Sequence, residues 1–350
     1  MAKVLANKEA VVRLRAALLA WYGCYRRDLP WRRTRDPYSI WVSEIMLQQT
    51  RVVAVLDRYR AFMARFPTVF ALAAAPEQEV LALWSGLGYY RRARMLHNAA
   101  QAVVSTRKGV MPATAAELRA LPGIGGYTAA AIASIAFNEP IAVVDGNVER
   151  VLCRLAGWDA DGGQCPKVEE LAARLVDPAN PRDFNQAIME LGATVCLPRN
   201  PQCLACPAAA DCRTRGEHKT TPRVKSVIRD SGYALCLRAS GKRGDSAKTL
   251  VLLEQRPPTV TVMPGLWELP ILREIPDAGV RMTVRHSIMN VNYVVRIREV
   301  RAEEVADLTV AGGEQRWVPL HEASEMALTG LARKVLKRVT AATGPLCQVN

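Results

Sequence analysis

The spacing of apolar residues changes partway along the chain and predicts two regions of different construction. From position 8 to about position 211, apolar residues recur three and four positions apart, as they do within residues 148–155, which is the period of one helix face. After Tyr233 apolar and polar residues alternate, and residues 249–253 and 293–297 have the composition of strands. The pattern predicts a mainly α region with two helical subdomains, followed by an α+β domain.

A basic and polar stretch divides these two regions. Residues 213–229 contain four arginines, two lysines and one histidine but few apolar residues. Such a composition is typical of an exposed linker, which could lie along phosphate groups or serve only as a solvated tether. We therefore predict a helical domain over residues 8–212, a linker over 213–229 and an α+β domain over 230–350.

The charge balance favours a polyanionic partner. The chain has 47 Lys and Arg against 33 Asp and Glu, a formal net charge of +14. A surplus of this size promotes binding to nucleic acid through counterion release, although a merely soluble basic protein would have the same balance. The first residues lack the apolar core of a signal peptide, and no apolar run is long enough to span a membrane. We expect a cytoplasmic protein with no membrane partner.

A glycine-rich turn between two predicted helices is the first candidate binding feature. The run LPGIGG at positions 121–126 cannot continue a helix, and glycine lets another backbone approach closely. The next helix is expected to begin near Tyr127, so the free amides at its N-terminus could bind a phosphate. An ordinary helical hairpin could have the same sequence.

Two acidic residues are candidates for chemistry. Asp145 follows an apolar run and precedes a predicted helix, where aspartate is a common cap, but Asn147 is the better-placed cap and would leave Asp145 free. Glu44 lies among apolar residues in the run WVSEIML at positions 41–47. Its carboxyl is either solvated on a helix face or buried with a raised pKa.

Four of the nine cysteines lie within seventeen residues of one another. An odd number of cysteines without a signal peptide argues against a disulfide framework. Four thiolates on short loops can hold a zinc ion or a four-iron cluster, and the spacing alone favours neither. The cysteines, spaced C-x6-C-x2-C-x5-C, are Cys196, Cys203, Cys206 and Cys212.

Taken together, these motifs resemble those of the helix–hairpin–helix DNA glycosylases, and among them the MutY-type adenine DNA glycosylases. The most specific matches are WVSEIMLQQT at 41–50, GLGYY at 86–90, the hairpin with Asp145 and the cysteine quartet. The resemblance covers about residues 8–340. It implies a monomeric, monofunctional enzyme of base excision repair, associated with the nucleoid. Its substrate would be double-stranded DNA with adenine mispaired with 8-oxoguanine or guanine.

The resemblance also implies catalytic roles. Glu44 would act as the general acid that protonates N7 of adenine and then helps to activate water, and Asp145 would stabilise the oxocarbenium ion. Tyr127 and Asn147 complete the implied catalytic group. The related endonuclease III glycosylase/lyases have a lysine where this chain has Tyr127, so cleavage of the strand by β-elimination should be weak.

Further residues are implied in holding the substrate, because the target base must leave the stack. Gln49 and Tyr89 would fill or wedge the duplex, while Trp31 and Arg32 match residues near the adenine pocket. Trp31 and Tyr89 could instead be simple core residues. The substrate-binding residues implied in this region are Trp31, Arg32, Gln49, Leu87, Tyr89, Gly123 and Gly125.

The resemblance extends to the cofactor and to the C-terminal domain. The cysteine spacing matches the loop that holds a [4Fe-4S] cluster in these glycosylases. Residues 231–340 resemble a Nudix-like domain, with GLWELP at 265–270 as the best match, but the glutamate pair of a working Nudix hydrolase is missing. In the family this domain reads 8-oxoguanine through a Phe-Ser-His loop. Here Ile288, Met289 and Asn290 stand in its place, so we expect discrimination on a changed basis.

Two alternatives belong to other classes. An endonuclease III-like pyrimidine-lesion glycosylase/lyase would share the hairpin and the cysteines, but Tyr127 and the long C-terminal domain argue against it. A non-enzymatic iron–sulfur protein that binds DNA or senses redox state would not need Glu44 and Asp145 together.

Overall fold

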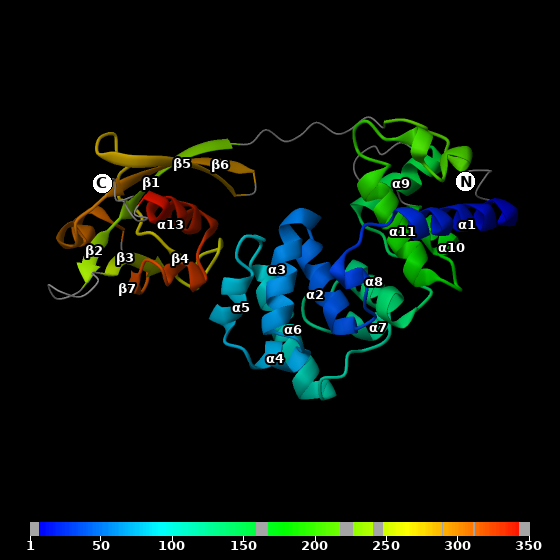
Figure 1. Ribbon diagram of the computed structural model, residues 1–350, viewed down its shortest axis with the longest axis horizontal. Coiled ribbons are helices and arrows are strands. Elements are labelled where there is room, and N and C mark those ends of the chain that lie inside the picture. Colours follow the sequence, from blue (N-terminus) through cyan, green and yellow to red (C-terminus); the bar gives the residue numbers. More distant parts are fainter. Residues whose placement is uncertain are drawn as a thin grey trace, which may run out of the picture. The chain divides into compact units, whose positions relative to one another are not determined.

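The computed structural model describes residues 7–158, 167–217, 227–240, 248–288, 290–310 and 312–342. The chain divides into two compact units, Met1–Ala74 with Met95–Pro222 and Ala75–Arg94 with Arg223–Asn350. Figure 1 labels most of the helices and strands of both. Residues 218–226 of the predicted linker and Met289 of the predicted recognition loop lie outside the described residues.

The first unit is helical, as the apolar spacing predicts. Short turns join most of its helices, and α6 begins within the segment Ala75–Arg94. Its elements are α1 (Lys8–Tyr25), η2 (Pro30–Arg32), α2 (Pro37–Leu47), α3 (Val52–Arg65), α4 (Val69–Ala74), α6 (Arg91–Arg107), α7 (Ala115–Leu118), α8 (Gly126–Phe137), α9 (Gly146–Ala156), α10 (Val168–Leu175), α11 (Pro181–Thr194), η3 (Cys203–Ala205) and η4 (Ala209–Asp211).

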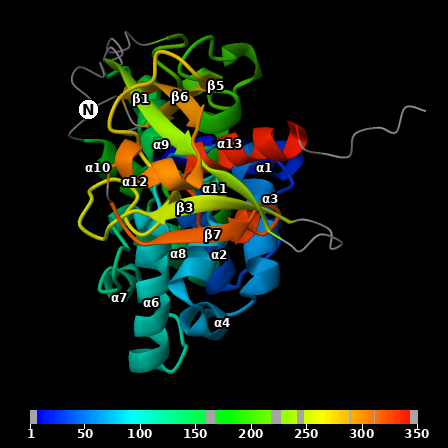
Figure 2. The same cartoon turned by 90° about the vertical axis from the view of Figure 1, so that its left-hand side faces the viewer.

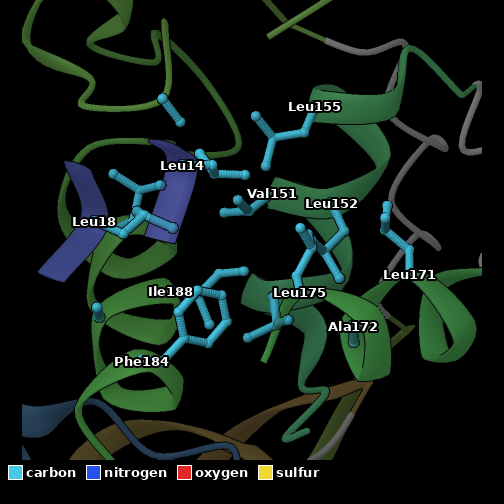
Figure 3. Packing of buried hydrophobic residues seen from close by; sticks show 14 of the residues in the cluster. Leu14, Leu18, Val151, Leu152, Leu155, Leu171, Ala172, Leu175, Phe184 and Ile188 are labelled. Atoms are coloured by element: carbon cyan, nitrogen blue, oxygen red, sulfur yellow. The ribbon is translucent and has the colours of Figure 1, made fainter. Parts of the chain in front are cut away.

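One apolar core fixes α9 and α11, the helices that carry much of the site described below. The apolar faces of α1, α9, α10 and α11 pack together, and Figure 3 shows their interlocking side chains. Because α11 also contacts α8, and α8 contacts α2, the ends of these helices are held in a fixed arrangement. The labelled side chains are Leu14, Leu18, Val151, Leu152, Leu155, Leu171, Ala172, Leu175, Phe184 and Ile188.

The second unit is α+β, which confirms that prediction. One sheet has the order β1-β6-β5, with β1 parallel and β5 antiparallel to β6. In the other, β3 pairs with β2, β4 and β7, and Figure 2 shows β3 and β7 side by side. The elements are α5 (Glu77–Leu83), β1 (Val227–Leu235), β2 (Leu237–Ser240), β3 (Lys248–Gln255), β4 (Trp267–Glu268), β5 (Val280–Ile288), β6 (Val291–Glu299), η5 (Ala302–Glu304), α12 (Val305–Leu308), β7 (Gln315–Pro319), η6 (Ala323–Glu325) and α13 (Gly330–Ala342).

The alternating pattern of these strands produces the core of the second unit. Val284 of β5, with Val295 and Ile297 of β6, packs against buried residues of α13 such as Val335. Segment Ala75–Arg94 groups with this unit although it is distant in sequence. Over the part of the chain that the structure describes, no helix combines the length and the apolar character needed to cross a membrane.

Candidate active site

A cavity of about 750 Å³ in the helical unit brings together most of the predicted site. Its walls come from η2, α2, the α7–α8 turn, the start of α9 and one face of α11. Such a volume suits a small polar ligand held by a few convergent groups. The predicted residues that line it are Trp31, Arg32, Glu44, Gln49, Gly123, Gly125, Tyr127, Asp145 and Asn147.

Glu44 is buried rather than solvated, which decides between the two interpretations of the sequence. It lies on α2, whose first turn is capped by Asp36, and only 6% of the residue is exposed. Burial raises the pKa of Glu44 to about 7; the hydrogen bond from Tyr127 opposes this rise, and the charge of Asp145 adds to it. A carboxyl with this pKa can both give and take a proton near neutral pH.

Tyr127 lies in the first turn of α8, directly after the glycine turn, as predicted. Its hydroxyl donates to Oε2 of Glu44 at 2.9 Å. Burial and the neighbouring Glu44 raise the pKa of Tyr127 well above its usual value, so the hydroxyl remains a donor. The turn needs glycine at position 123, where φ is +75° and a Cβ would lie 2.6 Å from Cβ of Met95.

Asp145 is itself the cap of α9, so the prediction that Asn147 caps this helix and leaves Asp145 free was wrong. Oδ1 of Asp145 accepts from the backbone N–H groups of Asn147 at 2.9 Å and Val148 at 2.7 Å. The reason is that the helix already begins at Gly146, which places Asn147 inside the first turn. Oδ2 accepts from Nδ2 of Asn147 at 2.9 Å. These bonds fix the carboxylate at the cavity wall.

Asn147 joins Asp145 to the neighbouring elements. Its Oδ1 accepts from Nη2 of Arg150 at 2.9 Å, and Arg150 also donates to the carbonyls of Gly192 at 2.6 Å and Cys196 at 2.9 Å. Position 192 must be glycine because a Cβ there would lie 2.7 Å from Cβ of Asn147. The start of α9, the end of α11 and the cysteine segment are thereby held together.

Glu190 is the main site residue that the sequence analysis missed. Its buried carboxylate accepts from the backbone and side chain of Arg27, at 2.6–2.9 Å, and from Nη2 of Arg32 at 2.7 Å. Burial alone would raise the pKa of Glu190, but the hydrogen bonds from Arg27 and Arg32 outweigh it and lower the value to about 2. The available signal was a lone acid on the apolar face of α11.

Removal of Glu190 is therefore expected to destabilise the fold. Glu190→Ala leaves Arg27 and Arg32 without their buried partner and should lower the free energy of unfolding by about 3–5 kcal/mol. The matched control on the same helix is Asp183→Ala, whose carboxylate lies 3.8 Å from Arg182 at the surface and should cost about 1 kcal/mol or less. Urea denaturation measures both, and equal small losses would show that the buried network contributes little.

The two predicted wedge residues both adopt a strained backbone. Gln49, two residues after the end of α2, has φ of +55° and lines the cavity. Tyr89, in the second unit, has φ of +47° and is 51% exposed. Such conformations are uncommon outside glycine and are often found at functional positions. Leu87, by contrast, is buried, and its carbonyl accepts from Nη2 of Arg92 at 3.0 Å.

Two of the three predicted recognition residues, Ile288 and Asn290, are described, and both lie at the turn between β5 and β6. Ile288 is half-buried and pairs with Val291, while Asn290 is exposed. Next to the turn, Oγ of Ser287 donates to Oδ1 of Asn292 at 2.6 Å. The described residues at this turn thus include the apolar Ile288 and the polar Ser287, Asn290 and Asn292.

Cys196, Cys203, Cys206 and Cys212 surround one small hollow, and Arg154 reaches Sγ of Cys196 at 3.4 Å. Burial raises the pKa of the Cys206 thiol to about 11. Within the described ranges, no group of three or more His, Cys, Asp or Glu converges as a site for a metal ion. In a cubane cluster, unlike a single-ion site, each of four thiolates binds a different iron, and four thiols line this hollow.

Known proteins resemble this chain in sequence and in fold. Residues 42–178 match the family model of the HhH-GPD superfamily base excision DNA repair proteins. The adenine DNA glycosylase of Homo sapiens is 37% identical over 93% of this chain and 74% of its own length, and that of Rattus norvegicus is 51% identical over 74% and 60%. The solved structure of a thermostable thymine-DNA glycosylase covers 59% of this chain and 96% of its own, with 32% identity and a TM-score of 0.55. The chain belongs to the adenine DNA glycosylase family, within the HhH-GPD superfamily.

Proposed function

We propose that this chain removes adenine paired with 8-oxoguanine or guanine from double-stranded DNA by hydrolysis of the N-glycosidic bond alone. The observation that carries the proposal is the pair of acids, Glu44 and Asp145, on one cavity. Glu44 is buried, accepts a hydrogen bond from Tyr127, and has a pKa that burial raises to about 7. A repair enzyme of this kind would act as a monomer. It would act on the genomic DNA, which in a bacterium lies in the nucleoid.

The proposed reaction uses the two acids in different ways. The extruded adenine enters the cavity, and protonated Glu44 gives its proton to N7 as the bond between C1′ and N9 breaks. Asp145 faces the positive charge that develops on the sugar. Glu44, now a carboxylate, accepts a proton from the water that attacks C1′, which restores the acid and leaves an abasic site.

We assign the C-terminal unit as a Nudix-like domain that reads the base opposite adenine. The α+β architecture and the GLWELP run at 265–270 support this assignment. Ile288 can wedge a base step and Asn290 can hydrogen-bond a base edge, because both lie at the β5–β6 turn. Met289 is the third residue of this proposed loop.

The specificity can be tested on duplexes with adenine opposite 8-oxoguanine, guanine or thymine, and on a duplex with an oxidised pyrimidine. After alkali treatment we expect product from the first two only, with 8-oxoguanine preferred. Equal rates of adenine excision opposite 8-oxoguanine and opposite guanine would contradict the role proposed for the turn between β5 and β6. Cleavage of the oxidised-pyrimidine duplex would favour the endonuclease III-like alternative, and binding without any cleavage would favour a non-enzymatic protein.

Pure protein should leave the DNA strand intact until alkali is added. The position after the hairpin glycines holds Tyr127, whose phenol cannot form the Schiff base that a lysine amine forms. Borohydride should therefore trap almost no covalent complex with the wild type. Extensive strand nicking without alkali, at the same rate as base release, would contradict the proposal.

The cofactor proposed for the quartet is a [4Fe-4S] cluster held by Cys196, Cys203, Cys206 and Cys212. When bound, such a cluster cross-links the segment that carries them. We expect brown protein with about four irons per chain and little zinc. Cys203→Ser should lose most of the iron, while Cys24→Ser, which changes an exposed cysteine elsewhere, should not. Colourless wild-type protein with stoichiometric zinc would contradict this.

A further inference from the structure

The segment that carries Tyr89 is built into the C-terminal unit. Residues Ala75–Arg94 leave the helical unit after Ala74 and re-enter it at Met95, yet they form one compact unit with the C-terminal strands. An ordinary loop on the helical unit would be held by its neighbours in sequence. Here the contacts that hold it come from residues far along the chain.

Tyr90 makes the first of these contacts. Its buried hydroxyl donates to the carbonyl of Leu328 at 3.0 Å. Leu328 is itself fixed, because it pairs with Trp267 of β4 and lies in the apolar core of this unit. Backbone bonds of 2.9 Å join Trp267 to both neighbours of Leu328, which are Ala327 and Thr329. The acceptor of the Tyr90 hydroxyl is therefore rigid.

Arg94 makes the second contact. Its Nη2 donates to the carbonyl of Pro264 at 2.6 Å, and its Nε donates to Glu77 at 2.9 Å. The next residues of the same two segments are also joined, because Nε2 of Gln78 donates to the carbonyl of Gly265 at 3.2 Å. One guanidinium thus joins the loop before β4 to the start of α5.

Directly before the first of these anchors, Tyr89 is exposed but supported. The Arg92 guanidinium lies over the rings of Tyr89 and Trp84, 5.4 and 5.6 Å from their centroids. It also donates to the carbonyls of Leu87 and Gly88, at 3.0 and 3.3 Å. The aromatic ring is thereby presented to solvent from a stiff loop with positive φ.

We propose that Tyr90 and Arg94 are positioning residues through which the C-terminal unit holds Tyr89 as a rigid wedge for base extrusion. This inference rests on the proposed function. Unstacking a base step costs a few kcal/mol, and a wedge already fixed in place loses less conformational entropy when it enters the duplex. The unit that reads the opposite base would then also control extrusion.

The test variant is Tyr90→Phe, and Tyr38→Phe is its control. The hydroxyl of Tyr38 also makes a buried hydrogen bond to a backbone carbonyl, that of Phe66 at 2.8 Å. Single-turnover excision is measured on a duplex with adenine opposite 8-oxoguanine and on one with the adenine in a single-base bulge, where extrusion costs less. We expect Tyr90→Phe to slow the paired substrate about tenfold and the bulged one less than about threefold, and Tyr38→Phe to affect both alike.

Fluorescence of 2-aminopurine beside the target adenine should show the same loss of unstacking for Tyr90→Phe. Arg94→Gln is the second variant, with the same expected pattern, and decides the question if Tyr90→Phe does not fold. If Tyr90→Phe, or Arg94→Gln in its place, slowed excision from the paired and the bulged substrate equally, the inference would be overturned. Failure of the wild type on both substrates would instead overturn the proposed function, so the two failures are distinguishable.

Discussion

Asp145→Asn is expected to slow adenine excision by about a thousandfold while duplex binding changes only a few fold. The substitution removes the negative charge that faces the developing oxocarbenium ion, and electrostatic groups of this kind contribute about 10²–10³ in rate. The side-chain oxygen can still accept from the N–H groups of Asn147 and Val148, so the cap of α9 is preserved. Single-turnover kinetics and a binding isotherm measure the two effects separately.

The control for this variant is Glu149→Gln. It removes a carboxylate from the first turn of the same helix, at a position that does not line the cavity. Its rate should stay within about twofold of the wild type. If both variants slowed excision alike, the loss would reflect the charge at the helix N-terminus and not Asp145 itself.

Glu44→Gln is expected to slow excision by about a hundred- to ten-thousandfold, because an amide cannot donate the proton that adenine needs to leave. The amide oxygen can still accept the hydrogen bond from Tyr127, so the packing of the cavity should be kept. Thermal unfolding of the variant should therefore differ little from that of the wild type, whose Glu44 is buried and protonated below pH 7. A variant with more than about a tenth of the wild-type rate would contradict the role of Glu44.

The pH dependence follows from the same group. The pKa of Glu44 is raised from 4.5 to about 7, so the active acid form persists to about pH 7 and is lost as the pH rises further. The wild-type rate should be flat below this pH and fall by about tenfold per unit well above it. The residual rate of Glu44→Gln should show no such fall. A wild-type profile that falls near pH 4–5 instead would indicate a solvated carboxyl.

The helices and strands were the most predictable part of this fold. The spacing of apolar residues near Val151 and the alternation near Val295 follow from local geometry, because each helix or strand buries one face. The start of α8 at Gly126 was predictable for a similar reason, since the glycine turn before it cannot remain helical.

The sequence pointed to several of the residues that line the cavity, but not to the environment of each. Glu44 could not be assigned as buried from the sequence, because its burial depends on helices distant in the chain. The cap of α9 was predicted two residues too late, at Asn147 instead of Asp145, since Gly146 gave no signal that the helix begins there. Glu190 became visible only with its partners Arg27 and Arg32, which precede it by more than a hundred residues.

The grouping of Ala75–Arg94 with the C-terminal strands has no local signal at all. In the sequence, nothing distinguishes Tyr90 and Arg94 from other residues of the helical region. Their hydrogen-bond acceptors are the backbone carbonyls of Leu328 and Pro264. A backbone carbonyl is present at every position, so no sequence pattern marks the ones that are used.

The most direct test of the account is the identity of the products from a duplex with adenine opposite 8-oxoguanine. Mass spectrometry after incubation with wild-type protein, without alkali, should find free adenine and an intact strand with one abasic site in equal amounts. Neither product should form with Asp145→Asn on the same timescale. The absence of free adenine with the wild type, or its release at an undiminished rate by Asp145→Asn, would contradict the two-carboxylate account.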